Sequence, residues 1–168
     1  GHTLALQSTA STSAYMVPMT TLLDRGMQPE ILLGPGDQPS AQGVGYVLAR
    51  SELNVAVWVQ KRMVDAGALS NLDWNDPQRM PPAFRQDLRV VHETAPYPRA
   101  LELVRVDMPA PVEARLREVL LQAADDPEAR QALHLFFNTS RFLPMDDQLR
   151  HALASLRDGV GRVRAEVE

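Results

Sequence analysis

The sequence contains no cysteine, which excludes disulfide bonds, thiolate metal sites and thiol nucleophiles. It also lacks a basic excess, because 17 lysine and arginine residues face 21 aspartate and glutamate residues. The resulting net charge of -4 opposes counterion-release binding, so we expect no nucleic-acid partner. No apolar run approaches the roughly 18 residues that a membrane span needs.

Motifs for catalysis and metal binding are missing as well. The histidines lie far apart and show neither HxxxH nor HExxH spacing; they are His2, His92, His134 and His151. His92 and Glu93 make a poor acid/base pair, because adjacent residues of a strand point to opposite faces. Nucleophile-elbow, Walker and dinucleotide motifs are absent. The sequence therefore predicts no catalytic residue, no metal and no cofactor.

The first 67 residues alternate strand-like and helix-like segments, which is typical of an α/β fold with a parallel or mixed sheet. The 168 residues, 45% of them hydrophobic, are enough for one domain or two small lobes. Strands are expected at 3–7, 31–33 and 53–59. Helices are expected at 14–25, 39–50 and 61–66.

The second half of the chain favours helices after an irregular connection over residues 70–87 with one or two helical turns. Residues 88–93 and 100–106 are strand-like, and the proline-rich link between them is stiff enough to cross between lobes. Amphipathic spacing and acidic helix starts predict three further helices. These are expected at 111–123, 127–137 and 146–164, the last interrupted near Gly159 and Gly161.

Small hydroxyl residues fill the turn between the first strand and the first helix. Ser11, Thr12 and Ser13 lie at the helix start, which Pro18 fixes because proline is tolerated only in a first turn. Backbone N–H groups, the positive end of the helix dipole and three hydroxyls can converge there on one oxyanion. The alternative is that these residues only cap the helix, as most such clusters do.

Trp58 is a second candidate for a binding site. The sequence places it at the end of the expected strand 53–59, where a large aromatic side chain can line a cleft. Such a side chain can equally fill the core, and the sequence leaves both interpretations open.

Several segments carry a family resemblance. Residues 1–6 read G-H-T-L-A-L and residues 11–15 read S-T-S-A-Y, with a proline at 18. They resemble the G-K-T-L-A-F strand and the S-T-S-G-Y helix start of phosphate/phosphonate-type periplasmic binding proteins of ABC transporters, the PhnD-like group with a type II binding-protein fold. Weaker similarities relate residues 53–58 to the family's V-D-A-A-A-V strand, residues 88–91 to its crossover and residues 142–144 to its F-V-P turn.

The resemblance implies a periplasmic solute-binding component that binds a phosphorus oxyanion and docks on an ABC permease, rather than an enzyme. Hydroxyls at the helix start would hold the phosphonate-like group, and aromatic residues would flank the cleft. The ligand-binding residues implied in this way are Ser11, Thr12, Ser13, Tyr15, Trp58 and Tyr97.

The resemblance also implies a lobe organisation. Residues 1–90 would form the second α/β lobe, and residues 91–168 the returning crossover and the C-terminal helical part of the first lobe. We expect the second lobe to be complete and the first to be partial, because the N-terminal portion of the first lobe has no counterpart. An incomplete lobe exposes apolar surface, so we expect self-association or a complementing chain.

Ligand choice within the family depends on charge. Relatives that recognise amines place a histidine and acids in the second lobe, whereas this chain offers Ser40 or Ala41 and no acid over 54–59. We therefore expect phosphonate, phosphite or phosphate rather than an aminoalkylphosphonate. The alternatives are a ligand-sensing module of the same fold that acts through a regulatory partner, and a small α/β enzyme, for which no motif supplies a base near Ser11 or Ser13.

Overall fold

The computed structural model describes residues 1–98, 100–136 and 138–167. The chain divides into two compact units. The first unit comprises Gly1–Pro96 together with the end of the chain from Ala154, and the second is Tyr97–Leu153. The lobe boundary that the sequence predicts near residue 90 refers to a two-lobe protein and stays a prediction.

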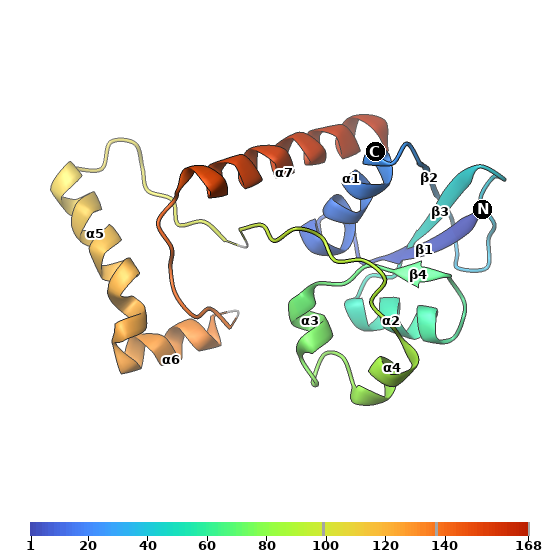
Figure 1. The fold of residues 1–168 in the computed structure, drawn as a ribbon, viewed down its shortest axis with the longest axis horizontal. Coiled ribbons are helices and arrows are strands. Elements are labelled where there is room, and N and C mark those ends of the chain that lie inside the picture. The colour runs from blue at the N-terminus through green and yellow to red at the C-terminus, as the bar shows by residue number, and fades with distance from the viewer. Residues whose placement is uncertain (99, 137, 168) are drawn as a thin grey trace. The chain divides into compact units, whose positions relative to one another are not determined.

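A parallel sheet forms the centre of the first unit (Figure 1). Its strands run in the order β2-β3-β1-β4 and every neighbouring pair is parallel. The strands are β1 (His2–Leu6), β2 (Gln28–Ile31), β3 (Gly43–Leu48) and β4 (Ala66–Gly67). This arrangement confirms the expected α/β class.

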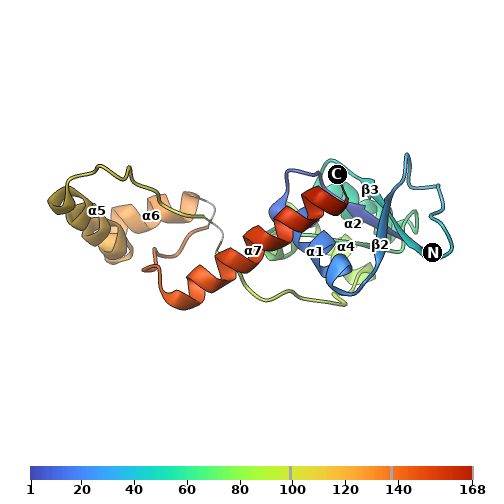
Figure 2. The ribbon, with the colours of Figure 1, turned by 90° about the horizontal axis from the view of Figure 1, so that it is seen from above.

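Helices cover both faces of this sheet (Figure 1). One face is covered by α1 (Val17–Asp24), which continues from the single π-helical turn η1 (Thr12–Met16), and by the C-terminal part of α7 (Asp147–Glu166). Figure 2 shows that part of α7 beside α1. The other face is covered by α2 (Glu52–Gln60).

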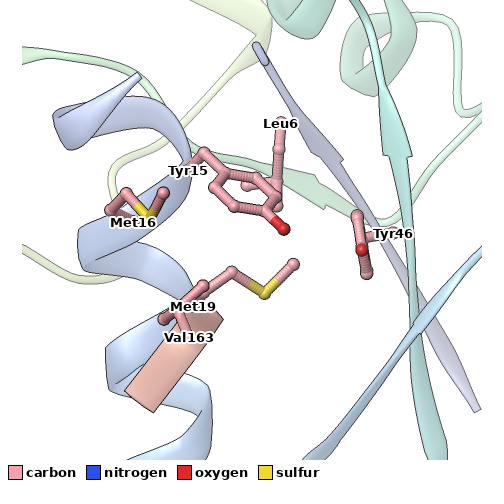
Figure 3. Close-up of a cluster of buried hydrophobic side chains, with 6 residues drawn as sticks. All are labelled: Leu6, Tyr15, Met16, Met19, Tyr46 and Val163. Atoms are coloured by element: carbon pink, nitrogen blue, oxygen red, sulfur yellow. The ribbon is translucent and has the colours of Figure 1, made fainter. Parts of the chain in front are cut away.

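Each face of the sheet has its own apolar core, because successive residues of a strand point to opposite sides. Leu6 of β1 packs with α1 and α7, whereas its neighbour Ala5 packs with α2. The first cluster, shown in Figure 3, consists of Leu6, Tyr15, Met16, Met19, Tyr46 and Val163. The second consists of Ala5, Val47, Ala49, Val55 and Val64.

Short helices complete the connection after the sheet, and longer ones make up much of the second unit. The connection carries α3 (Asn71–Asn75) and α4 (Pro82–Asp87). The second unit contains α5 (Ala110–Gln122), the 3-10 turn η2 (Ala123–Asp125) and α6 (Pro127–Leu135). As expected, Asp126 caps α6, since its side chain accepts a hydrogen bond from the Ala129 N–H at 2.8 Å.

Two central assignments made from the sequence are wrong, and they exchange strand for helix. Residues 39–50 contain β3 rather than a helix, and residues 53–59 lie in α2 rather than in a strand. Gly45 suits β3 because a Cβ there would meet the Leu32 side chain at 2.5 Å. A short continuous apolar run has no periodicity that separates a buried strand from a buried helix.

Residues 53–58, whose sequence resembles the family's V-D-A-A-A-V strand, therefore lie in a helix. Residues 64–68 read V-D-A-G-A, and Ala66–Gly67 of this segment form β4 against β1. The helix expected at 61–66 is also wrong, because residues 61–65 form turns and bends and Ala66 begins β4.

Two further expectations fail in the later part of the chain. Residues 88–93 and 100–106 form no strand within the part of the chain that the structure describes. A strand needs a partner for its backbone groups, and neither segment joins the four-stranded sheet. The expected interruption of the last helix is absent, because α7 continues through Gly159 and Gly161.

The two glycines of α7 differ in surroundings and allow a matched test of its packing. A Cβ at Gly159 would lie 2.7 Å from the Thr20 side chain of α1, whereas nothing lies within 4 Å of a Cβ at Gly161. We expect Gly161→Ala to stabilise the protein by about 1 kcal/mol through helix propensity, and Gly159→Ala to destabilise it. Urea unfolding of both variants measures the difference. Equal stabilisation by the two substitutions would contradict close packing of α7 on α1.

Candidate functional site

The carboxyl ends of β1, β3 and β4 meet at one edge of the sheet, because the strands are parallel. We call this the carboxyl edge. Each of the three strands is followed by a helix with a serine at the N-cap, namely Ser11, Ser51 and Ser70. Each serine hydroxyl accepts a hydrogen bond from the backbone N–H three residues later, at 3.0 to 3.1 Å.

The connections after β1 and β3 leave on opposite faces of the sheet, although the two strands are neighbours. Their pairing continues past the strand ends, where Ala49 N–H donates to the Leu6 carbonyl at 2.7 Å and Arg50 N–H to the Gln7 carbonyl at 2.8 Å. In open parallel sheets, ligands bind outside the carboxyl ends at such a switch point. The fold therefore directs attention to the loops that follow β1 and β3.

The hydroxyl turn, Ser11 to Ser13, lies at this edge. Thr12 is exposed, and Ser11 and Ser13 are partly exposed. The Ser11 hydroxyl caps the helix by accepting from Ala14 N–H at 3.1 Å, so the capping interpretation holds for this residue. The backbone N–H groups of Thr12 and Ser13 donate to no other atom in the described ranges. Two amides and the hydroxyls of Thr12 and Ser13 are thus available to an anion.

Tyr15 connects the hydroxyl turn to the apolar core of the first unit. Its side chain is fully buried in the core, and its ring meets Tyr46 edge-on with the centroids 5.9 Å apart (Figure 3). It anchors the π-helical turn to the sheet, and π-helical turns occur often at functional sites. The structure thus places Tyr15 beneath the hydroxyl turn rather than on its surface.

Trp58 is not brought beside the hydroxyl turn. It lies in the last turn of α2, seven residues after Ser51, which corresponds to about 10 Å along a helix. Its carbonyl accepts from Met63 N–H at 2.8 Å, shortly before β4 begins, and its partly buried ring packs on the second core cluster. The core interpretation therefore fits Trp58. Tyr97 belongs to the second unit, and its contact with a ligand stays a prediction.

Arg50 is a residue at the carboxyl edge that sequence reasoning missed. It is exposed, and its backbone adopts a left-handed conformation with φ of 68° between β3 and α2. The signal was concealed by the assignment of residues 39–50 to a helix. A strand ending at Leu48 would have placed Arg50 and Ser51 in a turn equivalent to the one after β1.

A pair of acids joins the loops after β3 and β4. Burial and a hydrogen bond to Asp73 raise the pKa of Glu52 to about 8. Burial also acts to raise the pKa of Asp73, but hydrogen bonds from Glu52, Ser70 and Arg79 outweigh it and hold that pKa at about 2. At neutral pH the pair therefore carries a shared proton, with Asp73 as the charged partner.

The acid pair predicts a pH-dependent stability. Between pH 4.5 and about 8 the folded protein retains a proton on Glu52 that the unfolded chain has released, so stability falls as pH rises through this window. Because Glu52 is only partly buried, we expect a loss on the order of 1 to 2 kcal/mol.

Urea unfolding of the wild type and Glu52→Gln at pH 5 and pH 8 measures this effect. The variant imitates the protonated acid, so it should lose most of the pH dependence, whereas the exposed Glu118→Gln control should keep it. An unchanged pH dependence in Glu52→Gln would contradict the shared proton.

Other kinds of site receive no support from the described part of the chain. Within it, no group of three or more histidine, aspartate or glutamate residues is arranged to hold a metal ion. None of the helices there combines the length and the apolar character needed to cross a bilayer.

Comparison with known proteins identifies the class. Residues 1–149 match the family model of the phosphonate periplasmic substrate-binding proteins of ABC transporters. The chain belongs to this family, as its sequence resemblance indicated.

Solved structures of XAC2383 from Xanthomonas citri are similar to this chain. The match to the structure bound to ATP has 52% sequence identity and a TM-score of 0.89, and it covers 100% of this chain and 61% of XAC2383. The match to the structure bound to chloride ion has 52% identity and a TM-score of 0.88, and it covers 99% of this chain and 60% of XAC2383. The chain thus spans about three fifths of this relative. The comparison with curated proteins gave no match.

Proposed function

We propose that this chain is the ligand-binding part of a periplasmic solute-binding component of an ABC transporter, and that it binds a phosphorus oxyanion at the carboxyl edge. The observation that carries the proposal is the pair of available amides at Thr12 and Ser13, beside the exposed Thr12 and the partly exposed Ser13 hydroxyls and at a switch point of the sheet. Such donors favour a compact anion with several acceptor oxygens.

The identity of the ligand rests on two further arguments. The family is described by phosphonate binding, and the relative XAC2383 is described as bound to ATP in one structure and to chloride in another. Phosphonate, phosphite, phosphate and the phosphoryl groups of a nucleotide share the oxygen pattern that the hydroxyl turn can hold. We propose this chemistry as the ligand class.

An ammonium group on the ligand finds little support at the carboxyl edge. Glu52 is mostly protonated at neutral pH, and the Asp73 carboxylate is already paired with Arg79 at 2.5 Å. A ligand ammonium would lose its hydration without gaining a free carboxylate. This supports a simple oxyanion over an aminoalkylphosphonate.

The transport role follows from family membership. We propose that two lobes close around the ligand by a hinge motion and that an ABC permease receives the closed form. The function is binding rather than turnover.

Substitution in the hydroxyl turn tests the binding site. Ser13→Ala removes one hydroxyl donor without removing the Ser11 cap, so we expect about a tenfold loss of affinity for phosphate and for ATP in calorimetry. Thr9→Ala is the matched control, because Thr9 is exposed in the same loop but precedes the helix start. Wild-type affinity in Ser13→Ala for both ions would contradict the proposed site.

Apolar exposure on the second unit supports the proposal of self-association or a complementing chain. Val112, Leu116 and Val119 of α5 line a groove and are 38% to 53% exposed. A large exposed apolar patch favours association.

We expect the isolated chain to form dimers or larger species at micromolar concentration. Val119→Glu should shift light scattering towards the monomer, whereas Gln131→Glu, an exposed change of equal charge on α6, should not. A clean monomer of the wild-type chain would contradict the expectation.

A further inference from the structure

The backbone of Arg50 is fixed beside the loop that carries the hydroxyl turn. Its N–H donates to the Gln7 carbonyl at 2.8 Å, which continues the backbone pairing of the β1 and β3 segments past the strand ends. Neighbouring strands lie about 4.8 Å apart, so Arg50 starts one strand spacing from the chain that leads to Ser11. An arginine side chain is long enough to extend from there over the carboxyl edge.

The left-handed backbone of Arg50 lies at an unusual place in the chain, between a strand and a helix. Three described non-glycine residues have positive φ, namely Arg50, Arg62 and Asn138. Arg62 follows the C-cap of α2, where this conformation commonly ends a helix, and asparagine tolerates it. Arg50 instead lies between a strand and a helix, where glycine would relieve the strain. Strain of this kind is retained where the surrounding structure fixes a residue for a purpose.

The charge of Arg50 is uncompensated in the described structure. The residue is exposed, and its guanidinium makes no ion pair with a described carboxylate. The acid nearest in sequence, Glu52, is engaged with Asp73. The hydroxyl turn supplies only neutral donors, so Arg50 would add a positive charge to them.

We propose that Arg50 is a specificity-determining residue of the carboxyl-edge site, which selects ligands with two or more linked phosphoryl groups. This inference rests on the proposed function. The hydroxyl turn holds one phosphoryl group, and the Arg50 guanidinium pairs with oxygens of the next. A planar guanidinium binds phosphoryl oxygens through two parallel hydrogen bonds, which lysine does not reproduce.

Calorimetry of the full 168-residue chain with phosphate, pyrophosphate and ATP tests the proposal at a fixed salt concentration. For Arg50→Ala we expect at least a tenfold loss of affinity for pyrophosphate and ATP, and no more than about a threefold loss for phosphate. Arg50→Lys should recover only part of the loss. Arg62→Ala is the matched control, because Arg62 is an exposed arginine that also has a left-handed backbone and lies at the other end of α2.

Arg50→Gly separates ligand binding from folding. Glycine relieves the left-handed backbone, so the Tm should stay equal or rise while the affinity for pyrophosphate falls as in Arg50→Ala. Unchanged affinity for pyrophosphate in Arg50→Ala, or an equal loss for all three ions, overturns the role of Arg50. If the wild type binds phosphate through Ser13 in that case, the proposed function stands. If the wild type binds none of the three ions, both proposals fail.

Discussion

The parallel pairing of β1 with β3 is the constraint on which the site depends. It brings the ends of two strands, far apart in sequence, to one edge, and it continues through Ala49 and Arg50 to the Leu6 and Gln7 carbonyls. Without that pairing the hydroxyl turn would be an ordinary helix cap. With it, neutral donors after β1 and a cation after β3 share one edge of the sheet.

The core and the site are parts of the same structure. Tyr15 occupies the apolar cluster beneath the hydroxyl turn, while Thr12 and Ser13 remain accessible above it. A buried aromatic residue that fixes the turn keeps the available amides in one orientation, so binding does not have to order them first. The helix start therefore combines packing below with the donors that we propose for recognition above.

The sequence predicted local features better than the identity of the central elements. The first strand, the cap at Ser11 and the helices after Ala110 and Asp126 follow from capping and amphipathic spacing, and the structure agrees. The assignments at 39–50 and 53–59 failed because apolar runs with glycines carry no clear period. That failure also concealed Arg50, since its importance depends on a strand ending just before it.

By itself the sequence determined the α/β class, the hydroxyl-rich helix start and the family, because these depend on residues close together in the chain. The tertiary structure decided which loops meet. In it, Arg50 N–H bonds to the Gln7 carbonyl, Trp58 lies in the last turn of α2, and the side chains of Glu52 and Asp73 share a hydrogen bond. The physical reason is that strand order and register arise from long-range hydrogen bonds and packing, which no local pattern of residues encodes.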